Sequence, residues 1–304
     1  MLLLINGIPY FAEKMETDFN ELDPKNRYIY CNTYGSIWGK VKFFVLLPFA
    51  RGVISANGVS DRSRAYDWLL LWKKKLVLYW QGTDVQIAVN LARLGTINRR
   101  YIDHAGNIGV APWFVEELKE AKVEVKYVPY GYVKHIGNES TYSEFAVLTY
   151  IATGAEDFYG WQYVRALALA RPDLKITVVG SNGEGLDVPA NVSMLGWVDE
   201  QKMLDLFRSH AVFVRLTEHD GKAFTVAQAL AAGCEVIWTY TYKHCHTIKR
   251  VDQELIDCIA ALEIEVKERG MRPNAKLIEH SLTAYDREKV VGNLLTNIHE
   301  IVNG

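Results

Sequence analysis

The sequence VFVRLTEHDGKAFTVAQALAAGCEVIW occupies residues 212–238 and combines a strand, a polar loop, a helix and a second strand. It begins with apolar residues, continues through a charged loop containing Gly221, and predicts a small-residue helix over Thr225–Ala232 that stops at Gly233. The first turn of such a helix has unpaired backbone N–H groups and the positive end of the dipole, so the segment predicts an anion site. The alternative is an ordinary strand–turn–helix unit whose charged side chains are solvated.

Short apolar runs of strand length recur on both sides of this segment, separated by stretches with helical spacing. Each run is largely apolar on both faces, which is typical of buried parallel strands in an α/β sheet. Repeated strand–helix–strand units predict right-handed crossovers and doubly wound sheets. The expected strands are 2–5, 28–31, 53–55, 76–80, 108–111 and 123–128 in the first half, and 145–151, 175–179, 192–195, 211–214 and 235–238 in the second.

A stretch rich in turn-forming residues, PYGYVKHIGNESTY at 129–142, separates the two series and is interpreted as an interdomain linker. We therefore expect a Rossmann-like N-terminal domain over 1–134 and a Rossmann-like C-terminal domain over 135–285. The remaining residues, 286–304, place Val290, Leu294, Ile298 and Ile301 at helical spacing and predict a C-terminal helix.

The composition narrows the functional class. The 304 residues are 49% hydrophobic and carry a formal net charge of −2, so no overall basic character indicates nucleic acid as a partner. The four cysteines are scattered without a C-x-x-C spacing, which favours a reducing, cytoplasmic setting. The N-terminal apolar run is short and reads as a first strand rather than a signal peptide. No apolar run is long enough to cross a bilayer.

Several motifs, in order along the chain, resemble those of retaining GT-B glycosyltransferases of family four. Residues 220–233 are similar to the donor-site signature of that family, and Asp220 and Gln228 hold its two acidic positions, eight residues apart. Similar segments elsewhere are WQGTD at 80–84, VAPW at 110–113, EEL at 116–118, PYG at 129–131, GSNG at 180–183 and LGWV at 195–198. The resemblance covers nearly the whole chain.

This resemblance implies two Rossmann-like parallel-sheet domains that face each other across a cleft, with the C-terminal helix returning to the N-terminal domain. It implies transfer of a sugar from a nucleotide-sugar donor, bound by the second domain, to a glycan, lipid-linked or small-molecule acceptor bound by the first. The nucleotide sugar is a co-substrate, and no separate cofactor is expected. Asp220 is predicted to be catalytic, and the acceptor or cleft residues are Gln81, Gly82 and Thr83. The implied donor-binding residues are Thr153, Gly154, Gly180, Ser181, Asn182, Trp197, Val198, Arg215, His219, Gly221, Ala223, Phe224 and Gln228.

The chain departs from the family pattern where the donor diphosphate is held. Family members usually carry Arg and Lys after the first strand of the second domain, whereas this chain has Thr153, Gly154 and Tyr159 there, with Glu156 and Asp157 between them. We therefore propose that Lys222, beside the predicted helix start, is catalytic and partly replaces the missing cations. The alternative is a solvated lysine on a loop.

Asp84 is predicted to face the cleft from the first domain and to contact sugar or acceptor as a catalytic residue. The alternative is an N-cap of a helix from Val85, and the two roles can coexist. No Asp-x-Asp sequence lies at a strand end and a helix N-terminus is available to neutralise phosphate, so we expect metal-independent catalysis. The segment KHCH at 243–246 is a weak metal signal without a partner cluster.

The segment WLLLWKKK at 68–75 joins two tryptophans to three lysines and could contact an anionic membrane, so peripheral attachment of the protein is one expectation. A buried helix followed by solvated lysines is the other. Three interpretations of the whole chain remain open. They are an active retaining glycosyltransferase, a catalytically inactive relative that binds a nucleotide or glycan, and another GT-B enzyme such as an epimerase or phosphorylase.

Overall fold

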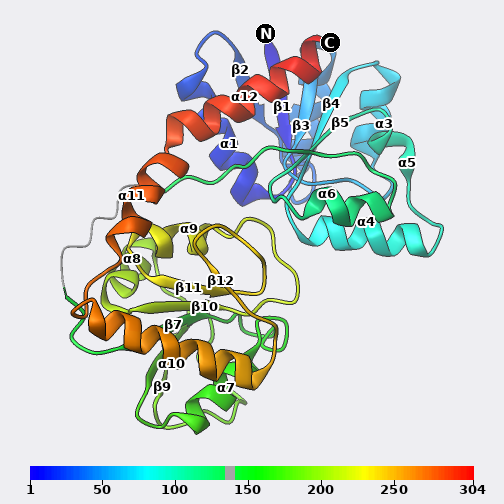
Figure 1. Ribbon diagram of the computed structural model, residues 1–304. Coiled ribbons are helices and arrows are strands. Elements are labelled where there is room, and N and C mark those ends of the chain that lie inside the picture. The colour runs from blue at the N-terminus through cyan, green and yellow to red at the C-terminus, as the bar shows by residue number, and fades with distance from the viewer. Residues whose placement is uncertain (134–140) are drawn as a thin grey trace. The chain divides into compact units, whose positions relative to one another are not determined.

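The computed structural model describes residues 1–133 and 141–304, which form two compact units (Figure 1). The first unit comprises Met1–Gly131 and Arg287–Gly304, and the second comprises Tyr132–Asp286. The predicted domain boundary at 134/135, and the half of the predicted linker from 134 to 140, lie outside the described residues.

The first unit is built on a six-stranded parallel sheet in the order β2-β1-β3-β4-β5-β6. Its strands are β1 (Leu2–Asn6), β2 (Arg27–Tyr30), β3 (Gly52–Ser55), β4 (Lys75–Trp80), β5 (Gly106–Gly109) and β6 (Lys126–Tyr127). Its helices are α1 (Pro9–Leu22), α2 (Ile37–Leu46), α3 (Arg64–Leu71), α4 (Thr83–Arg93), α5 (Arg99–Ile102), α6 (Phe114–Glu120) and α12 (Arg287–Asn303), with a 3₁₀ turn over Leu47–Phe49.

Helix α12 belongs to the first unit although it closes the chain. It packs against α1 and β4 through its buried stripe, which includes Val290, Leu294 and Ile298. Gly106 at the start of β5 lies so close to it that an added Cβ would come within 2.5 Å of the Ile301 side chain. A residue without a side chain is therefore needed where the sheet meets this helix.

The second unit repeats the architecture with the strand order β12-β11-β10-β7-β8-β9, again all parallel. Its strands are β7 (Ala146–Tyr150), β8 (Lys175–Val179), β9 (Val192–Met194), β10 (Val212–Arg215), β11 (Glu235–Trp238) and β12 (His246–Thr247). Its helices are α7 (Trp161–Ala170), α8 (Glu200–Ser209), α9 (Phe224–Ala231), α10 (Asp252–Glu268) and α11 (Ala275–Ala284).

Alternate residues of the second sheet face two helical layers. Val212 and Val214 of β10 belong to one buried cluster with α7 and α10. Phe213 points the other way and packs against Phe207 of α8, with their ring centroids 5.3 Å apart. Figure 1 shows the corresponding arrangement, with α7 and α10 on one side of the sheet and α8 and α9 on the other. Both faces are thus covered, as expected for a parallel sheet with apolar strands.

The structure corrects several predicted strand bounds. The strand expected at 108–111 forms two residues earlier, because its register with β4 pairs Val77 with Gly106. The strand expected at 123–128 contracts to Lys126–Tyr127. Val123 and Val128, at the two ends of the predicted strand, are buried but form no strand pairing. The apolar run therefore indicates that these residues are buried, and not that they belong to the sheet. The strand β12 was not predicted, because two residues are too short for a periodic signal.

A buried carboxylate fixes the start of α12 in the first unit. Asp18 of α1 accepts hydrogen bonds from the Tyr130 hydroxyl at 2.6 Å and from Arg287 Nη2 at 2.7 Å, and its side chain is only 2% exposed. We expect Asp18→Asn to lower the free energy of unfolding by about 1–3 kcal/mol in urea titrations, because it weakens a charge-assisted, buried contact. Glu21→Gln removes an exposed partner of the same Arg287 and should leave the midpoint unchanged; equal effects of the two variants would contradict this role.

Candidate functional site

The second sheet changes direction between β7 and β10. From β7 the chain proceeds outward to β8 and β9, and then returns to β10 on the other side before proceeding to β11 and β12. Open α/β sheets bind ligands at the carboxyl ends of the strands beside such a switch. The loops after β7 and β10 therefore mark the candidate donor site, and most residues predicted to contact the donor lie in these loops or in the adjacent loops after β8 and β9.

Backbone hydrogen bonds join three of these loops. The Thr153 N–H donates to the Gly180 carbonyl at 3.4 Å, the Gly180 N–H to the Gly196 carbonyl at 2.7 Å, and the Gly196 N–H to the Ser181 carbonyl at 3.0 Å. Gly180 has φ +94°, and an added Cβ would stand 2.6 Å from the Ile151 carbonyl oxygen, so only glycine fits. The structure thus brings Thr153, Gly180 and Ser181 together, and their contact with a donor stays a prediction.

The outer residues of these loops face solvent. Gly154 and Asn182 are exposed, and Trp197, in the loop after β9, has 81% of its surface exposed. Val198 beside it is half-buried. An exposed tryptophan at the carboxyl edge of a Rossmann-like sheet offers an aromatic face for stacking, which is compatible with its predicted contact with a base.

The loop after β10 contains a nearly buried ion pair. Arg215, the last residue of β10, binds both carboxylate oxygens of Asp220, and each side chain is about one-tenth exposed. Burial opposes the charge on Arg215, but the adjacent Asp220 outweighs it and raises the pKa of the guanidinium. Thr217 Oγ1 also donates to Asp220 at 3.2 Å, and the buried His219 ring packs edge-on against Tyr240. Asp220 and Arg215 therefore hold the loop in shape, whatever further role they have.

The Arg215 guanidinium also lies over the ring of Tyr159, 5.7 Å from its centroid. Tyr159 is one of the residues that stand where family members carry cations, so a cation from β10 approaches the loop after β7 from the neighbouring strand. Glu156, between these positions, accepts a hydrogen bond from the Gly154 N–H at 2.9 Å and so folds back on its own loop.

Arg250 is a further cation near this site that the sequence did not reveal. It follows β12, forms an ion pair with Glu218 at 2.9 Å, donates to the Asp157 carbonyl, and lies over the Tyr163 ring at 5.3 Å. Arg250 thus connects the loops after β7 and β10. Its position depends on packing between distant segments, which leaves no local pattern around residue 250.

Lys222 immediately precedes the N-cap of α9, Ala223, because the helix begins at Phe224. The helix thus begins one residue earlier than the predicted Thr225 and lies closer to Lys222. The ammonium lies 4.9 Å from the centroid of the Tyr285 ring, and burial lowers its pKa to about 8. Among the described residues no carboxylate pairs with Lys222 and no side chain caps the N-terminus of α9. Lys222 is half-buried in this loop, so the alternative of a fully solvated lysine does not describe it.

Gln228 lies on α9 and is half-buried between the buried Ala227 and Ala229. Within the part of the chain that the structure describes, its side chain makes no hydrogen bond, so its amide is available to a ligand. Gly221 and Phe224 are half-buried beside it in the same loop and first turn. The chain keeps a polar, uncharged group at the position of the second acidic residue.

In the first unit, Asp84 ties two loops together. Its carboxylate accepts backbone hydrogen bonds from Gly58 and Gln81 at 2.5 and 3.1 Å, from Gly82 at 2.7 Å and from Val85 at 3.0 Å. Burial raises the pKa of Asp84, although these N–H groups favour its charged form. The expected N-cap position is wrong, because α4 begins at Thr83 and Gly82 is its N-cap. The geometry supports a positioning role, and contact with substrate stays a prediction.

The other predicted acceptor residues lie beside this carboxylate at the carboxyl edge of the first sheet. Gln81 is 9% exposed, and its Nε2 has no hydrogen-bond partner among the described residues. Thr83, the first residue of α4, is exposed. Gly58 comes so close to the Trp80 ring that an added Cβ would be 2.0 Å from it, so the loop after β3 lies flat against β4.

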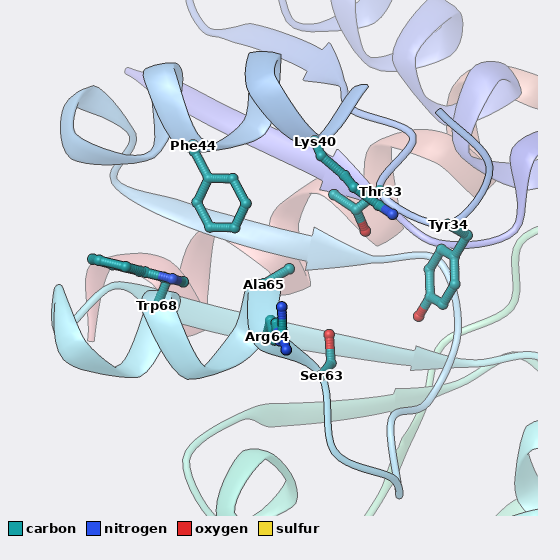
Figure 2. Close-up of a pocket in the computed structure, with 8 residues that line it drawn as sticks. All are labelled: Thr33, Tyr34, Lys40, Phe44, Ser63, Arg64, Ala65 and Trp68. Carbon is teal, nitrogen blue, oxygen red and sulfur yellow. The ribbon is translucent and has the colours of Figure 1, made fainter. Parts of the chain in front are cut away.

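A pocket of about 480 Å³ opens in the first unit between α2, α3 and the loops that precede them (Figure 2). Its lining combines two cations, hydroxyl groups and aromatic rings: Thr33, Tyr34, Lys40, Phe44, Ser63, Arg64, Ala65 and Trp68. Thr33 connects the pocket to the switch point of the first sheet, because its hydroxyl donates to Asn6 at the end of β1, 3.0 Å away. None of the lining residues was predicted as a site residue, although Trp68 begins the segment with a predicted membrane contact.

The segment 68–75 is buried in part, and its contact with a membrane stays a prediction. Leu69 is fully buried, whereas Trp68, Leu71 and Trp72 are 46%, 70% and 47% exposed. In 1–133 and 141–304, no helix is long and apolar enough to span a bilayer.

Those same residues contain no group of three side chains suited to hold a metal ion, and His246 of the KHCH segment pairs with Glu235 instead.

Solved structures of other proteins are similar to this chain over its whole length. It is similar to sucrose-phosphate synthase from Thermosynechococcus elongatus, with a TM-score of 0.72 at 11% identity over all of both chains. It is similar to a glycosyltransferase from Rickettsia africae, with a TM-score of 0.70 at 10% identity, covering 100% of this chain and 99% of the other. The pneumococcal O-GlcNAc transferase GtfA, determined with UDP and GlcNAc, gives a TM-score of 0.55 at 12% identity over 97% of this chain and 61% of its own.

These similarities confirm the predicted fold class: the chain has the GT-B fold of glycosyltransferases, with two Rossmann-like parallel-sheet domains. No protein-family model and no curated protein matches the sequence. At identities of 10–12% the similarity establishes the fold and leaves the activity to be argued from the site.

Proposed function

We propose that the chain is a retaining glycosyltransferase that moves a sugar from a nucleotide-sugar donor to a glycan, lipid-linked or small-molecule acceptor. The donor is held at the carboxyl edge of the second sheet, between the loops after β7 and β10. The observation that carries the proposal is Lys222, a half-buried cation without a carboxylate partner among the described residues, placed directly before the uncapped N-terminus of α9. The UDP in the similar O-GlcNAc transferase structure supports a nucleoside diphosphate as leaving group.

Such a site suits the charge that develops during transfer. When the glycosidic bond of the donor breaks, negative charge grows on the departing phosphate while the sugar becomes oxocarbenium-like. The ammonium of Lys222 and the N–H groups of the first turn of α9 would stabilise that phosphate. Gln228 would hydrogen-bond a hydroxyl of the nucleotide, and Trp197 would stack on its base.

The first unit would supply the acceptor side. Asp84 is assigned a positioning role: it fixes the Gly58 and Gly82 backbones, and so the shape of the surface that the acceptor meets. The Gln81 amide, which has no partner within the described residues, would bind an acceptor hydroxyl. Orientation of the acceptor by such fixed groups supplies a large part of the rate in reactions between two bound substrates.

The test uses the full chain with a panel of nucleotide sugars, first in a thermal-shift screen and then in a nucleotide-release assay with candidate acceptors. We expect one donor to raise the melting temperature and to release its nucleotide only when an acceptor is present. An analysis of the anomeric configuration of the product then tests retention. Donor binding without release, for every acceptor offered, would contradict the enzyme and leave a binding protein.

That binding protein is the second candidate function, and the Arg215–Asp220 pair favours it. One cation near the site is neutralised by its own carboxylate, and family cations are absent from the loop after β7. A relative that binds a nucleotide or glycan without turnover would keep the affinity and lose the rate. The two functions separate in a single measurement, because a binder shows a saturable melting shift and no time-dependent nucleotide release.

Turnover is expected to be independent of divalent metal. Lys222 and the N-terminus of α9 supply the positive charge that a metal would otherwise provide at the diphosphate. Initial rates measured after dialysis against excess EDTA should equal those of the untreated enzyme. Loss of rate that magnesium or manganese restores would show that a metal carries this charge instead.

A further inference from the structure

The exposed side of α2 is apolar. Its buried stripe consists of Gly39 and Phe43, and Gly39 lies so close to the loop after β2 that an added Cβ would stand 2.0 Å from the Asn32 carbonyl oxygen. The opposite side carries five large apolar side chains with exposed fractions between 38% and 81%: Ile37, Trp38, Val41, Phe44 and Val45. At about 100° per residue these five positions span an arc of roughly 120°.

Helix α3 and the turn after α2 extend this apolar area. Phe44 of α2 contacts Trp68 of α3 edge-on, with ring centroids 6.0 Å apart, and Figure 2 shows the two rings next to each other at one end of the pocket. We call the combined area the α2–α3 surface and define it by its exposed apolar residues: Ile37, Trp38, Val41, Phe44, Val45, Phe49, Trp68, Leu71 and Trp72. Soluble monomers rarely expose so many large apolar side chains in one area, so this surface is expected to be an interaction site.

The charges around the α2–α3 surface identify that partner. Residues 35–75 contain eight Lys and Arg and two Asp, whereas the whole chain has a formal net charge of −2. Lys40 and Lys42 stand on the two edges of the exposed arc of α2. The Lys42 ammonium donates to the Tyr30 carbonyl at 2.8 Å, whereas the long side chain of Lys40 can extend toward headgroups. Of the two acids, Asp67 is bound by the Tyr101 hydroxyl at 2.8 Å and by Arg100 at 3.2 Å. An apolar face with basic edges complements an anionic lipid surface.

The pocket beside this surface has the chemistry of a headgroup site. Phe44 and Trp68 belong to both the pocket and the surface, so the two are continuous. Lys40 and Arg64 provide cations for a phosphate, and Thr33, Tyr34 and Ser63 provide hydroxyl groups. Figure 2 shows Lys40 extending from α2 toward Thr33 and Tyr34. A lipid whose acyl chains lie against the α2–α3 surface could place its phosphate in this pocket.

We propose that the α2–α3 surface docks the protein on an anionic membrane and that the adjoining pocket receives a phosphate-bearing lipid headgroup. Membrane docking does not depend on glycosyl transfer, so it can fail or hold independently of the proposed function. It would place the acceptor unit at the bilayer surface, where a lipid-linked acceptor is concentrated.

The first test is flotation of the full-length protein with vesicles of phosphatidylcholine alone and of phosphatidylcholine mixed with phosphatidylglycerol. We expect binding to the anionic vesicles, weakened by added salt, with little binding to the neutral ones. At equal ionic strength, inorganic phosphate should release no more protein than sodium chloride does, since the acyl chains contribute to binding. Absence of binding to anionic vesicles, or equal binding to both kinds, would overturn the proposal.

Matched variants then locate the binding surface. The triple variant Ile37→Ser, Trp38→Ser and Val45→Ser should lower partitioning into anionic vesicles at least tenfold. The control Leu94→Ser, Leu169→Ser and Ile264→Ser removes three side chains that are 74%, 56% and 60% exposed elsewhere, and it should bind like the wild type. Equal loss in both triples would overturn the assignment. So would a wild-type dimer in sedimentation that the first triple abolishes, because the surface would then be covered by a second copy.

The pocket is tested separately with Lys40→Gln and Arg64→Gln. These side chains are not part of the apolar area, so the double variant should fold normally and still bind, but with a several-fold weaker preference for anionic vesicles. Brominated phosphatidylglycerol, which quenches tryptophan fluorescence, tests insertion of this face even in variants that still bind the vesicles. It should quench wild-type tryptophan fluorescence more strongly than that of Trp38→Phe, and equal quenching would contradict insertion of this face.

Discussion

Lys222→Met is expected to lower kcat by about 30- to 1,000-fold while changing the KM for the donor much less. The physical reason is that the ammonium interacts most strongly with the phosphate when the phosphate carries its full developing charge. A loss of about 2–4 kcal/mol of transition-state stabilisation corresponds to this range. Lys222→Arg should retain part of the rate, and Lys202→Met, on the exposed side of α8, should retain all of it. Unchanged kinetics for Lys222→Met would remove Lys222 from the mechanism.

The pH dependence gives a second readout of the same residue. Burial lowers the pKa of Lys222 to about 8 from 10.5, so the cation is present at neutral pH and is lost as the pH rises through 8. The kcat, which depends on the cation, should therefore fall as the pH rises through about 8. In Lys222→Arg the fall should disappear, since a guanidinium stays charged throughout the range. A persistent fall near pH 8 in the arginine variant would assign the titration to another group.

Lys222→Met, which should lower the rate, is expected to raise the free energy of unfolding. A lowered lysine pKa means that folding disfavours the charged form, and the cost is present below about pH 8 and vanishes as the pH approaches 10.5. The Tyr285 ring offsets part of it, leaving about 1–3 kcal/mol. Lys222→Met should therefore unfold at higher urea concentration than the wild type at pH 7, with the difference shrinking at pH 10. Loss of rate together with a gain of stability is characteristic of a functional residue rather than a structural one.

The fold could be predicted because its strands are apolar on both faces. β8 at Lys175–Val179 and β11 at Glu235–Trp238 form at the predicted residues, since central parallel strands bury both faces and leave a continuous apolar run. Prediction was weaker at the sheet edges. β6 keeps only two residues and β12 only two, because pairing there depends on contacts with a single neighbour.

The candidate site was predictable in position and less so in its contacts. Loops at the carboxyl ends of parallel strands must share one edge, so Thr153, Gly180 and Arg215 could be placed at that edge because the strands were predicted to be parallel. The pairing of Arg215 with Asp220 and the arrival of Arg250 depend on side-chain directions and on packing between distant segments. The pocket between α2 and α3 is of the same kind, because its lining comes from two segments about thirty residues apart whose contact has no local signature.

Asp220→Leu is expected to lower the free energy of unfolding by about 3–5 kcal/mol, more than Arg215→Met does. The two side chains form one ion pair and are each about one-tenth exposed, so removal of either leaves the other poorly solvated. A carboxylate can be neutralised by a proton and keeps its hydrogen bond from Thr217, whereas a guanidinium cannot lose its charge. Asp220→Leu should therefore be the more damaging single change in urea unfolding.

The double variant Arg215→Met, Asp220→Leu separates the structural role of the pair from its role in donor binding. Apolar groups of similar size in place of both charges should recover most of the stability lost by Asp220→Leu, because no buried charge remains. Arg165→Met, which breaks the exposed pair with Asp187, is the matched control and should change stability little. If the pair also serves the donor, the double variant will be stable but will lose the melting shift produced by the nucleotide sugar. A double variant that is stable and still binds the donor would restrict Arg215 and Asp220 to holding the loop, and would leave Lys222 and the N-terminus of α9 as the phosphate site.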